Sequence, residues 1–127
     1  MYILTEEPLP GITASEFKAY FAEKQSEKDF ADAYALLHAK FVWVEDEIYD
    51  YEEGTTAYEY ACTVAEEWEC LYDEYEQKIL AILKSEGVSV PETGYIKVIK
   101  PFMARNGYDY RDGWWIKKER LEGNNNV

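Results

Sequence analysis

The chain has 127 residues, of which 47% are hydrophobic and 17% aromatic, and its formal net charge is −13. This length and apolar content exclude a disordered chain and predict a single domain over residues 1–122, followed by a disordered tail at residues 123–127. The negative charge argues against direct contact with nucleic acid or an anionic membrane, which carry charge of the same sign. It favours a basic protein surface as the partner.

The sequence shows no sign of membrane insertion, export or cofactor binding. It contains no run of about 20 apolar residues that could span a bilayer, and its first residues lack the basic segment of a signal peptide. We therefore expect a cytoplasmic protein. Cys62 and Cys70 would lie ~12 Å apart on one helix, too far for a disulfide. His38 is the single histidine and no zinc-ligand spacing exists, so no cofactor or metal is expected.

Capping signals predict where the first two helices begin. Thr13 and Glu16 have the spacing of a capping box, in which each side chain bonds the backbone N–H of the other residue, so a helix is expected from residue 14 to about residue 25. Ser26 and Asp29 repeat this signal. A second helix is therefore expected to begin directly after Ser26.

The second helix is predicted to be long, over residues 27–53. Its apolar side chains recur at alternating intervals of four and three residues, the pattern of a coiled-coil-like seam. The seam residues are Phe30, Tyr34, Leu37, Phe41, Val44, Ile48 and Tyr51. Residues 41–44 taken alone all favour a strand, but the unbroken seam on both sides favours the helix. Gly54 is expected to end it.

A third helix is predicted over residues 56–86, with Thr56 and Glu59 as a cap pair and Gly87 as the stop signal. Its seam again alternates threes and fours. The seam residues are Tyr58, Ala61, Ala65, Trp68, Tyr72, Tyr75, Ile79 and Ile82. A connection of two or three residues forces the two long helices to lie antiparallel as a hairpin.

The charge balance reverses in the last quarter of the chain. Residues 1–94 carry 22 acids and 6 bases, a formal charge of −16, whereas residues 95–127 carry 4 acids and 7 bases, a formal charge of +3. A helix ending near Arg105 is favoured over a strand for residues 95–100, although Pro101 interrupts either. Residues 108–110 and 114–117 are expected to pair as a β-hairpin. The predicted fold class is therefore mainly α: a long antiparallel helical hairpin, one short N-terminal helix, one C-terminal helix and a small C-terminal β-hairpin.

The most unusual segment is Glu45 to Glu76, which holds thirteen carboxylates and no Lys or Arg. A chain reversal at Gly54 would gather seven of its acids at one end of the hairpin, and we expect these to bind the partner. They are Glu45, Asp46, Glu47, Asp50, Glu52, Glu53 and Glu59. Glu52 and Glu53 are expected at the negative end of the first long helix, where the dipole disfavours acids. Because helix stability does not favour acids at this position, binding of a partner is a possible reason for them.

Two other interpretations of the acidic segment stay open. One is a solvated surface that serves only solubility. The other is mimicry of DNA, because one charge per ~3.7 Å of helix axis approaches the ~3.4 Å spacing of one DNA strand. Tyr49 and Tyr60 lie off the two seams, so they are either exposed at a binding surface or packed by the C-terminal segment.

Catalysis and self-assembly are the alternative function classes. A helical di-metal site requires two Glu-x-x-His pairs, and His38 is the only histidine, while Glu66, Glu69 and Asp73 are expected to face water. A small enzyme or metal protein would use His38 with a nearby Glu or Cys, and Cys70 is expected roughly level with it across the hairpin. The long seams could also pair between chains, so either a monomer or a homodimer is possible.

A second patch combines Trp114 and Trp115 with Lys117, Lys118 and Arg120. Adjacent tryptophans in a strand point to opposite faces, so one is expected to cover the helical hairpin while the other stays partly open. The basic segment is expected to lie across the acidic helices rather than contact nucleic acid.

The C-terminal sequence also suggests a biological context. The run Asn106-Gly107-Tyr108, followed by Gly113-Trp114-Trp115-Ile116, resembles the C-terminal signature of small proteins carried by bacterial phages and conjugative elements. That family carries no assigned activity or site residues. The resemblance implies only a mobile-element context, in which small acidic proteins that modulate host defence are found.

Overall fold

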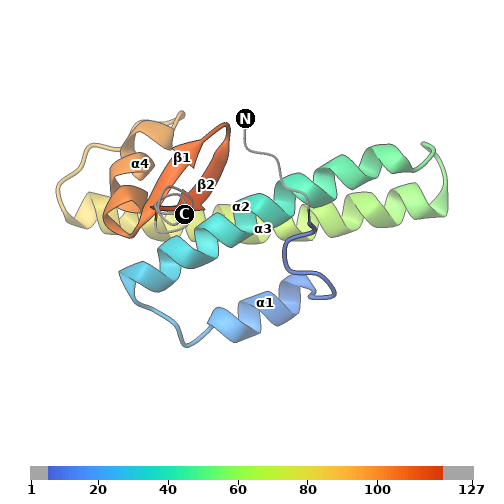
Figure 1. Ribbon diagram of the computed structural model, residues 1–127, viewed down its shortest axis with the longest axis horizontal. Coiled ribbons are helices and arrows are strands. Elements are labelled where there is room, and N and C mark those ends of the chain that lie inside the picture. Colours follow the sequence, from blue (N-terminus) through green and yellow to red (C-terminus); the bar gives the residue numbers. More distant parts are fainter. Residues whose placement is uncertain (1–5, 119–127) are drawn as a thin grey trace, which may run out of the picture.

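Figure 1 shows the computed structural model, which describes residues 6–118. These residues form four α-helices, one short 3-10 helix and a two-stranded antiparallel sheet, so the predicted fold class is confirmed. In chain order the elements are α1 (Ala14–Phe21), α2 (Glu27–Glu47), η1 (Ile48–Asp50), α3 (Thr56–Ser85), α4 (Ile96–Arg105), β1 (Tyr108–Arg111) and β2 (Trp114–Lys117). None of the helices in this described part is long and apolar enough to cross a membrane. The tail predicted at residues 123–127 lies outside the described residues.

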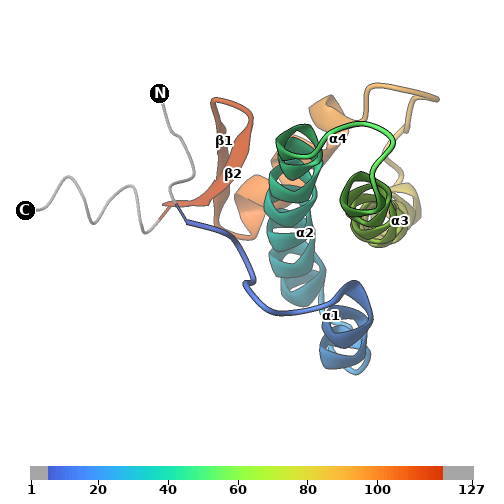
Figure 2. The ribbon, with the colours of Figure 1, turned by 90° about the vertical axis from the view of Figure 1, so that its right-hand side faces the viewer.

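The two long helices, α2 and α3, form the predicted antiparallel hairpin and are the centre of the molecule. Figure 2 looks along them: α3 lies on one side of α2 and the two strands lie on the other, with α1 crossing below. Helix α4 packs against α3 and β1 at the end of the hairpin away from the α2–α3 loop. Helix α4 and the strands therefore lie towards that end of the hairpin, and α1 lies beside its middle.

Most seam residues of α2 and α3 are buried, from Phe30 to Val44 on α2 and from Ala65 to Ile79 on α3. Leu37 and Ile79 are completely buried, and Tyr34 and Trp68 are nearly so. Each fully buried side chain of this size contributes roughly 1.5–3 kcal/mol of transfer free energy. The alternative that residues 41–44 form a strand is wrong, because they continue α2 without a break.

Two of the three predicted cap pairs are confirmed. Thr13 and Ser26 are N-caps with complete capping boxes. The third helix begins at residue 56 as predicted, but its predicted cap is wrong by one residue, because Thr55 and not Thr56 caps α3. The Thr55 hydroxyl accepts a hydrogen bond from the Tyr58 N–H at 3.2 Å and donates to the Glu52 carbonyl at 2.7 Å. A threonine in extended conformation can make both bonds, whereas Thr56 already has helical geometry.

Both early helices end sooner than predicted. Helix α1 ends at Phe21 rather than near residue 25, and the Gln25 side chain donates to the Ala22 carbonyl in the turn that follows. Helix α2 ends at Glu47 rather than residue 53 and tightens into η1. Its last turn contains three acids and no base, which opposes the helix dipole there. Gly54 adopts a left-handed conformation, with φ of +89°, within the loop rather than at the end of α2.

Helix α4 forms despite the proline inside it, so the strand alternative for residues 95–100 is wrong. Ile99, Phe102 and Met103 are buried, and this burial outweighs the hydrogen bond that Pro101 cannot donate. The predicted β-hairpin is confirmed, with Arg111 paired to Trp114.

As predicted, one tryptophan of β2 covers the hairpin and the other stays partly open, although both lie beside side chains of α2. Trp115 is buried, with its ring 6.0 Å from Tyr34 and 4.6 Å from Tyr110, whereas Trp114 is only half-buried beside His38. Lys118 donates to the Ala104 carbonyl at 3.1 Å, so this part of the basic segment is held by α4.

Candidate functional site

The end of the hairpin formed by residues 45–60, here called the hairpin tip, extends beyond every other described element. In Figure 1 it is the right-hand end, where the end of α2, the connecting loop and the first turns of α3 extend past α1, α4 and the strands. No Lys or Arg occurs anywhere between Lys40 and Lys78. The tip is therefore an acidic end with no neighbouring base on the same segment.

All seven acids predicted to form the binding surface lie at the hairpin tip. Six are exposed and Glu47 is half-buried; the exposed six are Glu45, Asp46, Asp50, Glu52, Glu53 and Glu59. Within residues 6–118, none of the seven takes part in an ion pair. Their charges are thus uncompensated by the fold, and their role in binding stays a prediction.

Three tyrosines stand among these acids with much of their surface in solvent. Tyr49 is 84% exposed, Tyr60 is 71% exposed and Tyr51 is 45% exposed. The alternative that the C-terminal segment covers Tyr49 and Tyr60 is wrong for its described part, residues 95–118. Tyr51 was placed on the α2 seam by its spacing, and it is exposed because the helix ends before it. Exposed tyrosine is typical of protein interfaces, since its ring is apolar and its hydroxyl can form hydrogen bonds.

The helix ends distribute the acids differently from the sequence prediction. Glu52 and Glu53 do not follow the negative end of α2 directly but precede the positive end of α3, where the dipole favours them, so the expected penalty there is wrong. The unfavourable position belongs instead to Glu45, Asp46 and Glu47 in the last turn of α2. Glu47 is partly compensated, because the Trp43 Nε1–H donates to its Oε1 at 2.8 Å.

The electrostatic environment of the tip also acts on Tyr58. The pKa of its hydroxyl is raised, first by repulsion from Cys62 and a hydrogen bond with it, and further by burial and by the negative charge of Glu53. Tyr58 therefore keeps its proton at neutral pH.

His38 meets aromatic rings rather than a cysteine. Its ring centroid lies 5.7 Å from that of Tyr72 and 5.8 Å from that of Trp114. Its Nδ1 is buried and has no hydrogen-bond partner among the described residues, and burial lowers the pKa of the imidazole. Cys70, which was expected roughly level with His38, is exposed in a groove on the side of α3 that faces α1.

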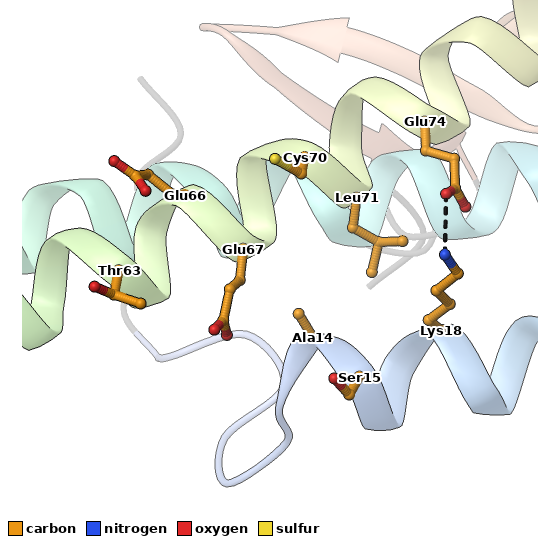
Figure 3. Close-up of a pocket in the computed structure, with 9 residues that line it drawn as sticks. All are labelled: Ala14, Ser15, Lys18, Thr63, Glu66, Glu67, Cys70, Leu71 and Glu74. Carbon is orange, nitrogen blue, oxygen red and sulfur yellow. Dashed lines mark hydrogen bonds and ion pairs between the residues drawn. The ribbon is translucent and has the colours of Figure 1, made fainter.

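Figure 3 shows this groove, a cavity of about 460 Å³ between α1 and α3. Glu67 and Leu71 point toward α1, Glu66 points away from it, and Lys18 reaches Glu74 with an N–O distance of 3.2 Å. No histidine lines the groove. Within residues 6–118, no three His, Cys, Asp or Glu side chains are placed to hold a metal ion. The three acids expected to face water, Glu66, Glu69 and Asp73, are all exposed.

Sequence reasoning missed two polar contacts inside the core. Lys40 is only 4% exposed, pairs with Glu7 at 2.9 Å and lies over the ring of Trp68, at 5.5 Å from its centroid. The Tyr34 hydroxyl lies 2.9 Å from that of Tyr72 and donates to Glu76 at 3.2 Å. The seam positions of Tyr34 and Tyr72 indicate that each hydroxyl needs a hydrogen-bond partner, because a buried Tyr hydroxyl usually has one. The spacing of the seam does not show which residue that partner is.

Polar contacts also fasten the C-terminal helix to the hairpin at its other end. Arg105 pairs with Glu27 at the start of α2 and with Glu86 at the end of α3, the latter at 2.9 Å. This contact lies away from the hairpin tip. The prediction for the basic segment of Lys117, Lys118 and Arg120 is separate, and Arg120 lies outside the described residues.

Comparison of the chain with protein-family models, with curated proteins and with solved structures gave no match. The resemblance of the C-terminal sequence to proteins of phages and conjugative elements therefore stays a prediction.

Proposed function

We propose that this chain is a non-enzymatic interaction protein whose hairpin tip binds a basic surface on a partner protein. The observation that carries the proposal is the exposure of Tyr49 and Tyr60 on a projecting end whose acids have no ion-pair partner in the described part of the chain. Within this proposal the protein acts in the cytoplasm, without metal or cofactor.

The acids and the tyrosines have different tasks in this proposal. Uncompensated carboxylates attract a basic surface at long range and raise the rate of association, but each exposed ion pair adds only about 0–1 kcal/mol. The tyrosines supply the apolar contact from which most affinity at interfaces comes. Binding should therefore weaken strongly with added salt but not vanish, because salt screens only the charge contribution.

The mobile-element resemblance suggests the kind of partner. A protein from a phage or conjugative element that carries an acidic, aromatic end suits a host protein whose basic surface normally contacts nucleic acid. Under this proposal the chain modulates host defence by occupying that surface.

Affinity capture from host cells, with two charge-matched variants, tests the proposal. The tip variant carries Asp46→Asn, Glu47→Gln, Asp50→Asn, Glu52→Gln and Glu53→Gln. The control variant removes five exposed acids elsewhere: Glu23→Gln, Glu66→Gln, Glu69→Gln, Asp73→Asn and Glu92→Gln. Both variants change the net charge by the same amount.

We expect the wild type and the control variant to retain the same basic partner at low salt and the tip variant to lose it. Equal retention by all three proteins would contradict a role for the tip. Equal loss from both variants would also contradict it, because net charge alone would then account for binding.

A further inference from the structure

A second groove opens between the N-terminal segment, α1, α2 and the two strands. Its volume is about 570 Å³, and most of its lining is apolar or aromatic. The lining residues are Leu9, Ile12, Glu16, Phe17, Tyr20, Phe21, Asp32, Leu36, Tyr108 and Lys117. None of them belongs to the hairpin tip.

The lining of the groove combines buried core side chains with large apolar side chains that are exposed to solvent. Its floor includes Phe17 and Phe21, which are only 3% and 6% exposed. Its walls include Ile12, Tyr20 and Leu36, which are 39%, 66% and 37% exposed. Large apolar side chains around an opening to the core are typical of ligand sites, and such sites measure roughly 300–1,000 Å³.

The two acids of the groove already accept hydrogen bonds within the fold. Asp32 accepts hydrogen bonds from the Lys28 ammonium at 2.9 Å and from the Tyr108 hydroxyl at 2.7 Å. Glu16 accepts from the Thr13 N–H at 3.1 Å in the first turn of α1, where the helix dipole favours a negative charge. Lys28 therefore compensates the charge of Asp32, and the capping box holds the carboxylate of Glu16.

Lys117 is the charged lining residue that lacks such a partner. Among residues 6–118 its side-chain ammonium makes neither a hydrogen bond nor an ion pair. It is paired with Tyr108 in the ladder, and paired residues of two strands project to the same face. The strand register therefore directs the Lys117 ammonium to the side of the groove on which Tyr108 packs.

We propose that this groove binds a small apolar acid, with an aliphatic or aromatic body between Ile12, Tyr20 and Leu36 and a carboxylate at Lys117. Bringing the body into the groove removes apolar surface of both molecules from water. The net charge of −13 does not exclude an anion here, because at physiological salt charges beyond about 8 Å are largely screened. This site is independent of the partner proposed for the hairpin tip.

Titration of the full chain with decanoate and with decylamine tests the proposal, since the two probes share one tail and differ in charge. Binding is followed by calorimetry and by NMR of the Ile12 and Leu36 methyl groups. We expect decanoate to bind one per chain and to shift both methyl signals. Lys117→Gln should weaken decanoate about threefold to fivefold, as for an exposed ion pair, and Lys117→Arg should restore it.

Matched variants separate the groove from general effects. Tyr20→Ser and Leu36→Ser should each weaken decanoate about tenfold, while Lys84→Gln and Tyr49→Ser, exposed positions outside the groove, should leave it unchanged. Thermal melts check that every variant folds. The proposal is overturned if decylamine shifts the groove methyl signals at lower concentration than decanoate does, if Lys117→Gln and Lys84→Gln behave alike, or if decanoate shifts neither methyl signal.

Discussion

At the scale of single residues, His38 is the side chain whose protonation the fold opposes. Its Nδ1 is buried without a partner in the described structure, and two aromatic rings flank it. Burial lowers the pKa of the imidazole from its ordinary value of 6.5. The neutral form is therefore the one that the folded chain accommodates.

This lowered pKa predicts a loss of stability on acidification. The folded state binds a proton less readily than the unfolded state, so the contribution of His38 is fully present above pH 6.5 and is lost as the pH falls below that value. Urea unfolding of wild type and His38→Phe at pH 7.5 and pH 5.5 measures it. We expect the wild type to lose more free energy of unfolding than the variant. An equal loss would show that other groups dominate this interval.

The hydroxyl of Tyr34 is the second residue-scale test. It lies 2.9 Å from the Tyr72 hydroxyl and donates to Glu76, and burial raises the pKa of Tyr72 to about 12. Tyr34→Phe removes both hydrogen bonds but keeps the ring, so we expect the free energy of unfolding to fall by about 1–2 kcal/mol. Tyr49→Phe, on an exposed ring, is the control and should change nothing. No loss in Tyr34→Phe would mean that the hydroxyl is not bonded as described.

Both residues show what the sequence could not provide. The three-four spacing placed Tyr34 and Tyr72 on facing seams, and it placed His38 beside the seam. Spacing gives the face of a helix, but it does not give the rotation of one helix against the other. The pairing of two hydroxyls across the hairpin depends on that rotation, and the contact of His38 with Trp114 depends on how the distant β-hairpin packs.

At the scale of elements, Arg105 joins three helices. It pairs with Glu27 at the start of α2 and Glu86 at the end of α3, and its own helix is α4. Its hydrogen bonds are the first cause of the lowered pKa of Glu27. The stability from this pair is therefore present above pH 4.5, the ordinary pKa of Glu27, and is lost as the pH falls toward the lowered value.

Replacement of Arg105 should loosen α4. The side chains are partly exposed, so we expect Arg105→Gln to cost about 1 kcal/mol, and Arg105→Lys to cost less because it keeps the charge but not the two-pronged geometry. Arg111→Gln is the matched control, since Arg111 pairs only with the nearby Asp109. Urea unfolding provides the comparison. If Arg111→Gln destabilised the chain as much as Arg105→Gln, the bridging role would be wrong.

The elements were largely predictable and their ends were not. Capping spacings gave the starts of α1 and α2, because a cap is a contact between residues three apart. Helix α2 ends at three consecutive acids whose charges oppose the helix dipole. The apolar spacing, in contrast, continues past this point through Ile48 and Tyr51. The seam therefore predicted a longer helix than the structure has, and the exposure of Tyr51 was missed with it.

At the scale of the whole molecule, charge and packing occupy different ends of the hairpin. Helix α4 and the strands lie towards one end of the hairpin, and the hairpin tip forms the other end. The gathering of seven acids could be predicted, because it required only that two amphipathic helices fold back on each other. The ion pair of Lys40 with Glu7 could not, because the N-terminal segment reaches α2 only through the tertiary fold.

Photo-crosslinking in host cells tests whether the hairpin tip contacts a basic partner protein. A benzoylphenylalanine is placed at position 49 or 60 in the tip, or at position 88, which is 36% exposed and lies outside it. We expect positions 49 and 60 to form adducts with the same basic protein and position 88 to form none with it. Adducts from position 88 alone, or the same adducts from all three positions, would contradict it.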